Sequence, residues 1–340
     1  MIKKIFCIVI LSMLFFPQIV FAEESTESEI FQEQQSEFKI KDFLKETKKY
    51  TSNFLENIDI SEIFKDATKG KIDNKKIFAK ILNLLGKEVK GTLKTLISIL
   101  IIVLIHSLLK SITDGLEHKE VSKIIYYVEY ILIVTIIMSS FSEILDSVKN
   151  SITDLIGFSQ SLIPLLITLM LYTGSITTSS VLEPILLFLI QFIANLIQNL
   201  ILPVVSIIVV LIVISKISER IQITKLAKFM NTSIVWFLGI VLTLFVGVMS
   251  LEGTLTASVD GITAKTTKAA VSNLIPVVGK ILGDSVDTVL GCGVVLKNAV
   301  GVVGVIVIIG ICLLPIIKLA TFSIMYSILS CVIEPLADEK

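Results

Sequence analysis

The sequence predicts an all-α, polytopic helical membrane protein with about seven to eight spans. Of its 340 residues, 54% are hydrophobic and 18% are charged, whereas soluble domains carry about 25% charged residues. Several apolar windows also reach the roughly 17 to 25 residues that a helix needs to cross a hydrocarbon core. The net charge is +0 and no dense basic segment suggests a nucleic-acid partner. The lipid bilayer is therefore the expected environment.

Residues 1–22 have the pattern of a secretory signal peptide. Lys3 and Lys4 precede a short apolar run, and Val20 and Ala22 supply small side chains at the −3 and −1 positions. We expect cleavage after Ala22, with an uncleaved anchor as the alternative. In both cases the chain that follows leaves the cytoplasm.

Residues 23–91 are predicted to be an extracytoplasmic acidic linker followed by amphipathic helices. The linker, 23–37, is polar and acidic, which is typical of disorder. Apolar residues then return at helical spacing over 38–90. These helices are too small to form a sizeable core alone. They are expected to dock on each other, on the membrane surface or on a partner protein.

Residues 92–250 hold six predicted spans. The apolar run 181–215 would be about 52 Å long as one helix, against a bilayer core of about 30 Å. Because proline disrupts a helix interior, Pro203 is expected to divide this run into two short spans. Segment 142–160 carries four charges and is expected along the membrane surface. The six spans are 92–112, 124–141, 162–176, 181–200, 203–217 and 232–250.

Segment 216–231 is basic, with four Lys or Arg residues against Glu219 alone. Loops rich in Lys and Arg stay in the cytoplasm. If the chain starts outside, two spans over 181–217 place this segment inside, whereas one span would place it outside. We therefore expect a cytoplasmic 216–231 and a next region that begins on the outer face.

Residues 251–299 are glycine-rich and resemble neither a clean span nor a clean loop. We expect an amphipathic or re-entrant segment, broken between Pro276 and Gly279, that packs against neighbours, lines a pore or contacts another subunit. Gly279 and Gly283 form a small-xxx-small face, and Asp284 and Asp287 share a helical face. The candidate lining or contact residues are Asn273, Pro276, Gly279, Gly283, Asp284, Asp287, Lys297 and Asn298. Residues 300–340 then form the C-terminal span or spans and a polar tail.

Glu129 and Glu183 are the candidate intramembrane polar residues. A carboxylate near the centre of a spanning helix costs about 2.5 to 3.5 kcal/mol on insertion scales. Each either faces a bundle interior or water path or lies at the interface. Glu183 precedes Pro184 near a span end, which favours an interfacial helix start.

Catalytic and metal-binding patterns are missing from the sequence. His106 and His118 form no HExxH signature, and the segment 157–159 does not complete a GxSxG elbow. The cysteines after the leader lack paired spacing and are expected to be small buried hydrophobes; they are Cys292, Cys312 and Cys331. We expect no enzyme, no cofactor and no metal site.

The run 256–304, with DGITAKTTKAAVSNLIPVVGK and GDSVDTVLGCGVVLKNAVGVVG, resembles the stage III sporulation protein AE family. EPILLFLIQFIANLIQNLILPVV and ISERIQITKLAKF precede it in the family's order, and the resemblance covers about residues 92–335. Members of that family continue past the EPLADEK-like sequence into further hydrophobic residues, so the resemblance leaves the topology after Lys318 open.

The resemblance implies a membrane subunit of the mother cell–forespore channel complex, placed in the mother-cell-derived outer forespore membrane. Its implied partners are other stage III sporulation proteins, a cytoplasmic ATPase and further copies of itself. Residues 23–91 and 251–299 would face the intermembrane space and act as platform or conduit. The rival is a stand-alone secondary transporter with a site at the broken helices around Pro276 and Gly279. A third reading is a structural anchor for an ATPase at 216–231.

Overall fold

The computed structural model describes residues 33–51, 59–70, 74–114, 119–217, 223–274 and 278–334. These ranges are helical apart from short turns and contain no strand, which confirms the all-α prediction. The helices are α3 (Ile40–Thr51), α4 (Ile60–Thr68), α5 (Asn74–Asp114), α6 (Lys119–Tyr172), α7 (Ile176–Leu196), the π-helix η1 (Ile197–Ile201), α8 (Leu202–Ile217), α9 (Thr224–Leu274) and α10 (Val278–Ile333).

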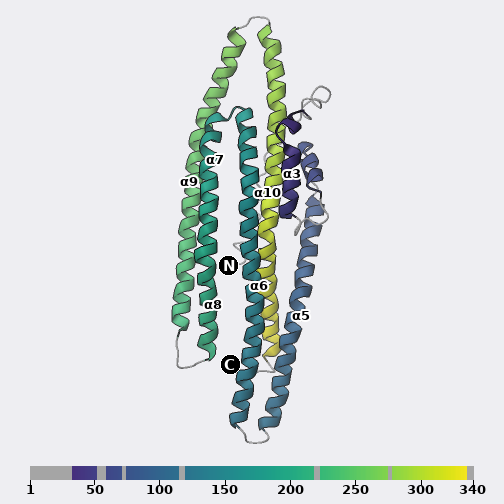
Figure 1. The fold of residues 1–340 in the computed structure, drawn as a ribbon, viewed down its shortest axis with the longest axis vertical. Coiled ribbons are helices and arrows are strands. Elements are labelled where there is room, and N and C mark those ends of the chain that lie inside the picture. The colour runs from purple at the N-terminus through teal and green to yellow at the C-terminus, as the bar shows by residue number, and fades with distance from the viewer. Residues whose placement is uncertain are drawn as a thin grey trace.

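The long helices run antiparallel and form one elongated bundle (Figure 1). α5 starts near α3 and α4 and runs to the opposite end, from which α6 returns. The rod of α7, η1 and α8 makes the third pass, α9 the fourth and α10 the fifth. α10 packs against α6, α5 and α4, so it is the central helix of the fold.

Five helical stretches in the described residues are long and apolar enough to cross a membrane, which supports the membrane class. They are 82–109, 124–172, 178–215, 224–250 and 289–333. The predicted seven to eight spans are thus joined into fewer, longer helices. The 54 residues of α6 extend about 81 Å at about 1.5 Å per residue. Because a hydrocarbon core is only about 30 Å thick, much of α6 projects beyond it.

Segment 142–160, expected along the membrane surface, is instead the middle of α6. It joins the predicted spans 124–141 and 162–176 without a turn. Pro164 and Pro315 also lie inside continuous helices, α6 and α10. Neighbouring helices and local adjustments allow membrane helices to accept proline. The sequence analysis predicted no helix end at either of these two prolines, whereas the break that it predicted at Pro276 lies between α9 and α10.

The expected break at Pro203 is a π-helical turn rather than a chain reversal. The Leu202 backbone N–H donates to the Ile197 carbonyl, an i→i+5 bond. This bond closes the turn directly before proline, which has no N–H of its own to donate. α7, η1 and α8 consequently continue as one rod (Figure 1).

Two pairs of predicted spans are each joined into one helical pass, but α3 and segment 216–231 still lie at opposite ends of the bundle. Joining two spans in α6 removes one crossing, and joining two in α7–α8 removes another, so an odd number of passes still separates α3 from segment 216–231. In Figure 1 the end of α8 and the start of α9 lie at the opposite end from α3, whereas the end of α9 and the start of α10 lie at the α3 end. The charge-based prediction of sides fits this arrangement.

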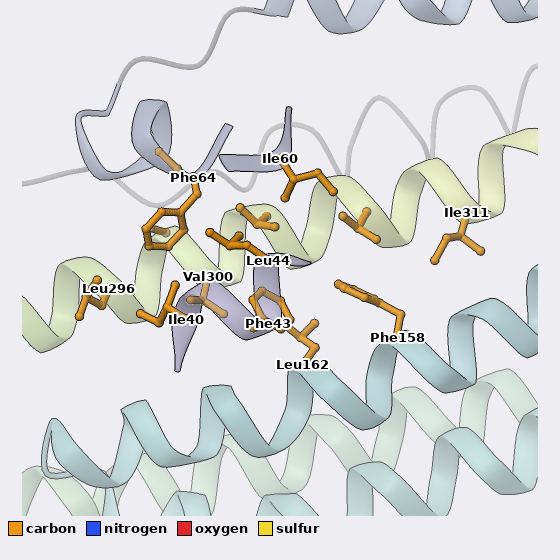
Figure 2. Packing of buried hydrophobic residues seen from close by; sticks show 14 of the residues in the cluster. Ile40, Phe43, Leu44, Ile60, Phe64, Phe158, Leu162, Leu296, Val300 and Ile311 are labelled. Carbon is orange, nitrogen blue, oxygen red and sulfur yellow. The ribbon is translucent and has the colours of Figure 1, made fainter. Parts of the chain in front are cut away.

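α3 and α4 contact each other, as one of the three alternatives drawn from the sequence expected, and both also dock on the long helices of their own chain. α3 buries Ile40, Phe43 and Leu44, and α4 buries Ile60 and Phe64. Their partners come from α6 and α10 (Figure 2). They include Phe158, Leu162, Leu296, Val300, Val303, Val307 and Ile311. The spacing of three and four residues along α10 is that of one helix face.

Residues 251–274 extend α9 and residues 278–299 begin α10, so the glycine-rich segment forms two helical arms. The arms join through 275–277, outside the described residues, where Pro276 lies. Whether these arms re-enter a membrane stays a prediction.

Candidate functional site

The glycine-rich candidates occupy the two arms beside the α9–α10 connection. Asn273 is the penultimate residue of α9. Pro276 and the side chains of the candidates between 279 and 287 lie outside the described residues, and these candidates begin α10: Gly279, Gly283, Asp284 and Asp287. Their roles as lining or contact residues stay predictions.

Lys297 and Asn298 lie further along α10, away from its packed face. Lys297 is half-buried and Asn298 is exposed, whereas Leu296 and Val300 are fully buried in the core. The two polar side chains therefore point away from the α3–α4 docking face. That position suits a contact with another molecule, which remains a prediction.

Glu183 is half-buried in the third turn of α7, which begins at Ile176. It lies seven residues beyond the helix start, and Pro184 follows it inside the helix. The helix-start position expected for Glu183 is therefore wrong, because α7 begins before the predicted span. Its interfacial role stays a prediction.

Glu129 is the predicted site residue with the most defined surroundings. It is 8% exposed in α6, and its Oε2 contacts Nδ1 of His106 from α5. A buried carboxylate is costly unless it is hydrogen-bonded and paired. The imidazole N–H is the partner that this carboxylate requires.

His106 is the contact of Glu129 that the sequence analysis did not identify. α5 and α6 form an antiparallel hairpin around residues 115–118. His106 and Glu129 are equally far along the chain from the point between residues 117 and 118, so they lie at the same depth. That symmetry was the available signal, and it becomes visible only once the two helices are known to be neighbours.

A cavity of about 940 Å³ opens beside this pair, between α5, α6 and the end of α10. Its polar lining consists of His106, Tyr126, Glu129, Tyr130, Tyr326, Ser330 and Glu334, and its apolar lining consists of Ile99, Val103, Ile133, Ile137, Leu329 and Ile333. The size falls at the upper end of the about 300 to 1,000 Å³ of small-molecule sites.

One polar atom of this lining, Oε1 of Glu129, is buried without a hydrogen-bond partner in the described part of the chain. The Tyr130 hydroxyl, by contrast, donates to the Val213 carbonyl of α8 at 3.1 Å. The Tyr126 ring meets the His106 ring edge-on at 6.4 Å between centroids. The cavity thus combines a fixed carboxylate with aromatic walls.

A second polar cluster closes the other end of the bundle. Gln34, 4% exposed, donates from Nε2 to the Tyr172 hydroxyl at 3.0 Å and to the Val289 carbonyl at 3.1 Å. The Phe38 ring packs edge-on against Tyr172 at 5.0 Å between centroids. These contacts tie the segment before α3 to both α6 and α10. They hold the N-terminal helices against the bundle, so these helices are joined to it by side-chain contacts as well as by the chain.

No group of three or more metal-ligating side chains lies together in the described ranges. The cysteines of α10 differ in exposure: Cys292 is buried, Cys312 is half-buried and Cys331 is exposed. The expectation that all three are buried is therefore wrong for Cys331.

Comparison with known proteins gives a family match. The family model described as stage III sporulation protein AE matches residues 58–340. The stage III sporulation protein AE of Bacillus subtilis (strain 168) is 30% identical over 256 residues, which cover 75% of this chain and 64% of that relative. The chain therefore matches less than two thirds of the relative's length. No solved structure matches.

Proposed function

The chain belongs to the stage III sporulation protein AE family, and on that premise we propose that it is a membrane subunit of the mother cell–forespore channel complex. It acts in endospore formation as a platform or conduit in the outer forespore membrane. Other stage III sporulation proteins are its partners, with a cytoplasmic ATPase and further copies of itself among them.

The docked α3–α4 pair is the observation that carries this proposal. Buried side chains fix the pair on α6 and α10, and Gln34 ties the preceding segment to the same two helices. The outward face of α3 is exposed and charged, with Lys41, Asp42, Lys45 and Glu46. A charged helical surface held rigidly at one end of a membrane bundle suits recognition of a partner protein.

The opposite end of the bundle suits a different partner. Lys225 and Lys228 are exposed at the start of α9, within the basic segment 216–231. The ATPase of the proposed complex would meet the protein here, on the cytoplasmic side. The platform hypothesis therefore predicts that substitutions in α3 weaken partner binding, whereas the anchor hypothesis predicts that substitutions at the start of α9 do so.

Co-purification of stage III proteins from sporulating cells tests the platform. The variant Lys41→Glu/Lys45→Glu reverses two exposed charges one helical turn apart without touching the α3 core. We expect the amount of extracytoplasmic partner proteins that co-purify with this variant to fall at least about tenfold, since rim charges of an interface govern association. We also expect a lower spore yield. Lys225→Glu/Lys228→Glu is the matched control, which keeps those partners. Full retention of partners by the α3 variant would contradict the platform.

The alternative hypothesis, a secondary transporter, predicts an activity of the purified protein alone. Uptake of a solute into liposomes that contain this chain alone, sensitive to Asp284→Asn or Glu129→Gln, would favour a secondary transporter. We expect no such uptake from the isolated subunit, because a platform needs its partners to form a passage. Spore yield and liposome uptake therefore separate the two readings.

A further inference from the structure

The cavity between α5, α6 and α10 lies away from the α3–α4 surface and plays no part in the platform role. It is anionic in its described lining: Glu129 and Glu334 supply carboxylates, and no Lys or Arg is among the lining residues. His106, the one histidine of the lining, contacts Glu129. A cavity with this charge attracts cations.

Glu129 lines this cavity and has one carboxylate oxygen without a hydrogen-bond partner in the described ranges. His106 holds Oε2, while Oε1 is buried and has no hydrogen-bond partner in the described ranges. Leaving a buried acceptor unpaired costs about 1 to 3 kcal/mol, more if the group is charged. A ligand that brings an N–H donor to Oε1 removes that cost. The His106 contact keeps the carboxylate oriented for it.

The walls select the kind of cation. Three tyrosine rings line the cavity, Tyr126, Tyr130 and Tyr326, together with aliphatic side chains. Aromatic faces attract ammonium groups. A bare metal ion would require several oxygen ligands at short distances, and about 940 Å³ is far larger than one ion. Carboxylate, aromatic rings, aliphatic wall and size together fit an organic amine.

We propose that this cavity binds the protonated amine of an organic cation with an apolar portion. Glu129 is its counter-ion, and His106 is the residue that positions the carboxylate. The tyrosines surround the ammonium group, and the aliphatic wall takes the hydrocarbon. A soluble alkylamine and the amine headgroup of a lipid share this chemistry.

Binding of dansylcadaverine, a fluorescent primary alkylamine, to the full chain in phosphatidylglycerol nanodiscs tests the proposal. We expect saturable binding to the unaltered chain and about 10- to 100-fold weaker binding to Glu129→Gln, because a charge-assisted hydrogen bond contributes about 1.5 to 3 kcal/mol.

Glu183→Gln is the matched control, since Glu183 is a half-buried carboxyl of α7 outside the cavity lining. It should bind the probe as the unaltered chain does. A dansyl alcohol of equal length, which lacks the ammonium group, should bind at least about tenfold more weakly than dansylcadaverine. Thermal unfolding of each variant shows whether it folds.

Nanodiscs with added phosphatidylethanolamine separate the two sources of the amine. If the lipid headgroup is the ligand, it competes with the probe in the unaltered chain; without competition the ligand is soluble. Absence of saturable probe binding to the unaltered chain would overturn the proposal. Equal binding by a folded Glu129→Gln, or equal binding of the dansyl alcohol, would do the same.

Discussion

Two glycines of α6 and α10 lie where a neighbouring helix approaches closely. A Cβ added at Gly304 of α10 would lie 2.8 Å from Cδ2 of Leu162 in α6, and one added at Gly157 would lie 2.7 Å from Oη of Tyr50 in α3. Real Cβ atoms do not approach neighbours this closely, so a partner would have to move. At these two positions the close contact is with a neighbouring side chain, and neither glycine has a positive φ.

The pair Gly304→Ala and Gly301→Ala tests this packing. Both changes favour the helix by about 1 kcal/mol, but a Cβ at Gly301 meets nothing within 4 Å. Overpacking costs about 1 to 3 kcal/mol. We therefore expect Gly304→Ala to unfold at a lower temperature than Gly301→Ala in the same detergent. Equal unfolding temperatures would show that α6 and α10 are not in close contact at Leu162.

Single residues also show what the sequence can and cannot predict. Glu129 was identified because a carboxylate is conspicuous within an apolar run. Its partner was not, because His106 lies 23 positions away and becomes a neighbour only through the α5–α6 hairpin. The free Oε1 and the cavity depend on α10 as well, which is far more distant in the chain.

α4 starts at a defined cap that also links it to α3. Asp59 accepts the Ser61 backbone N–H at 3.0 Å and pairs with Nζ of Lys48 in α3 at 3.1 Å. The Ser61 hydrogen bond and then the Lys48 ammonium hold the pKa of Asp59 below its ordinary 3.8. The ionised carboxylate is therefore the form that stabilises this junction.

The α3–α4 junction should weaken in acid. Because the folded pKa of Asp59 is the lower one, its stabilisation is complete above about pH 4 and is lost as the pH falls through that folded pKa. Hydrogen-exchange protection of α4, corrected for the intrinsic rate, should drop in this range. Both partners are about half exposed, so the loss should be small. Asp59→Asn keeps a good cap and should remove the pH dependence, and an unchanged acid response in that variant would contradict this role.

Elements were predictable where a local pattern defines them. The apolar spacing of α3 and α4 gave their helical form, yet their docking site depends on a face of α10 made by Leu296, Val300 and Val303, some 250 residues away. Pro203 was expected to end a helix because proline lacks an N–H. The π-helical turn before Pro203 depends on a local adjustment of the backbone, and no single residue type predicts such a turn.

At the scale of the whole molecule, five antiparallel passes place the α3–α4 surface and segment 216–231 at opposite ends (Figure 1). The sequence predicted this opposition from the signal peptide, the number of spans before segment 216–231 and the charge of that segment, whereas the described residues form fewer and longer apolar helices than the predicted spans. The predicted and observed sides of segment 216–231 agree because joining two pairs of spans removes two crossings, which leaves the side unchanged. One part of the chain changes side between the two descriptions: the turn between α6 and α7, around Gly174.

Cysteine labelling at the α6–α7 turn tests the five-pass bundle most directly. Ile176→Cys, at a residue 54% exposed, is introduced into a background whose native cysteines are replaced by alanine. Lys45→Cys and Lys225→Cys mark the two ends. The five-pass bundle predicts that a membrane-impermeant maleimide applied from outside modifies Ile176→Cys and Lys45→Cys but not Lys225→Cys. Protection of Ile176→Cys until the membrane is permeabilised would contradict it, because the turn would then face the cytoplasm as the predicted spans require.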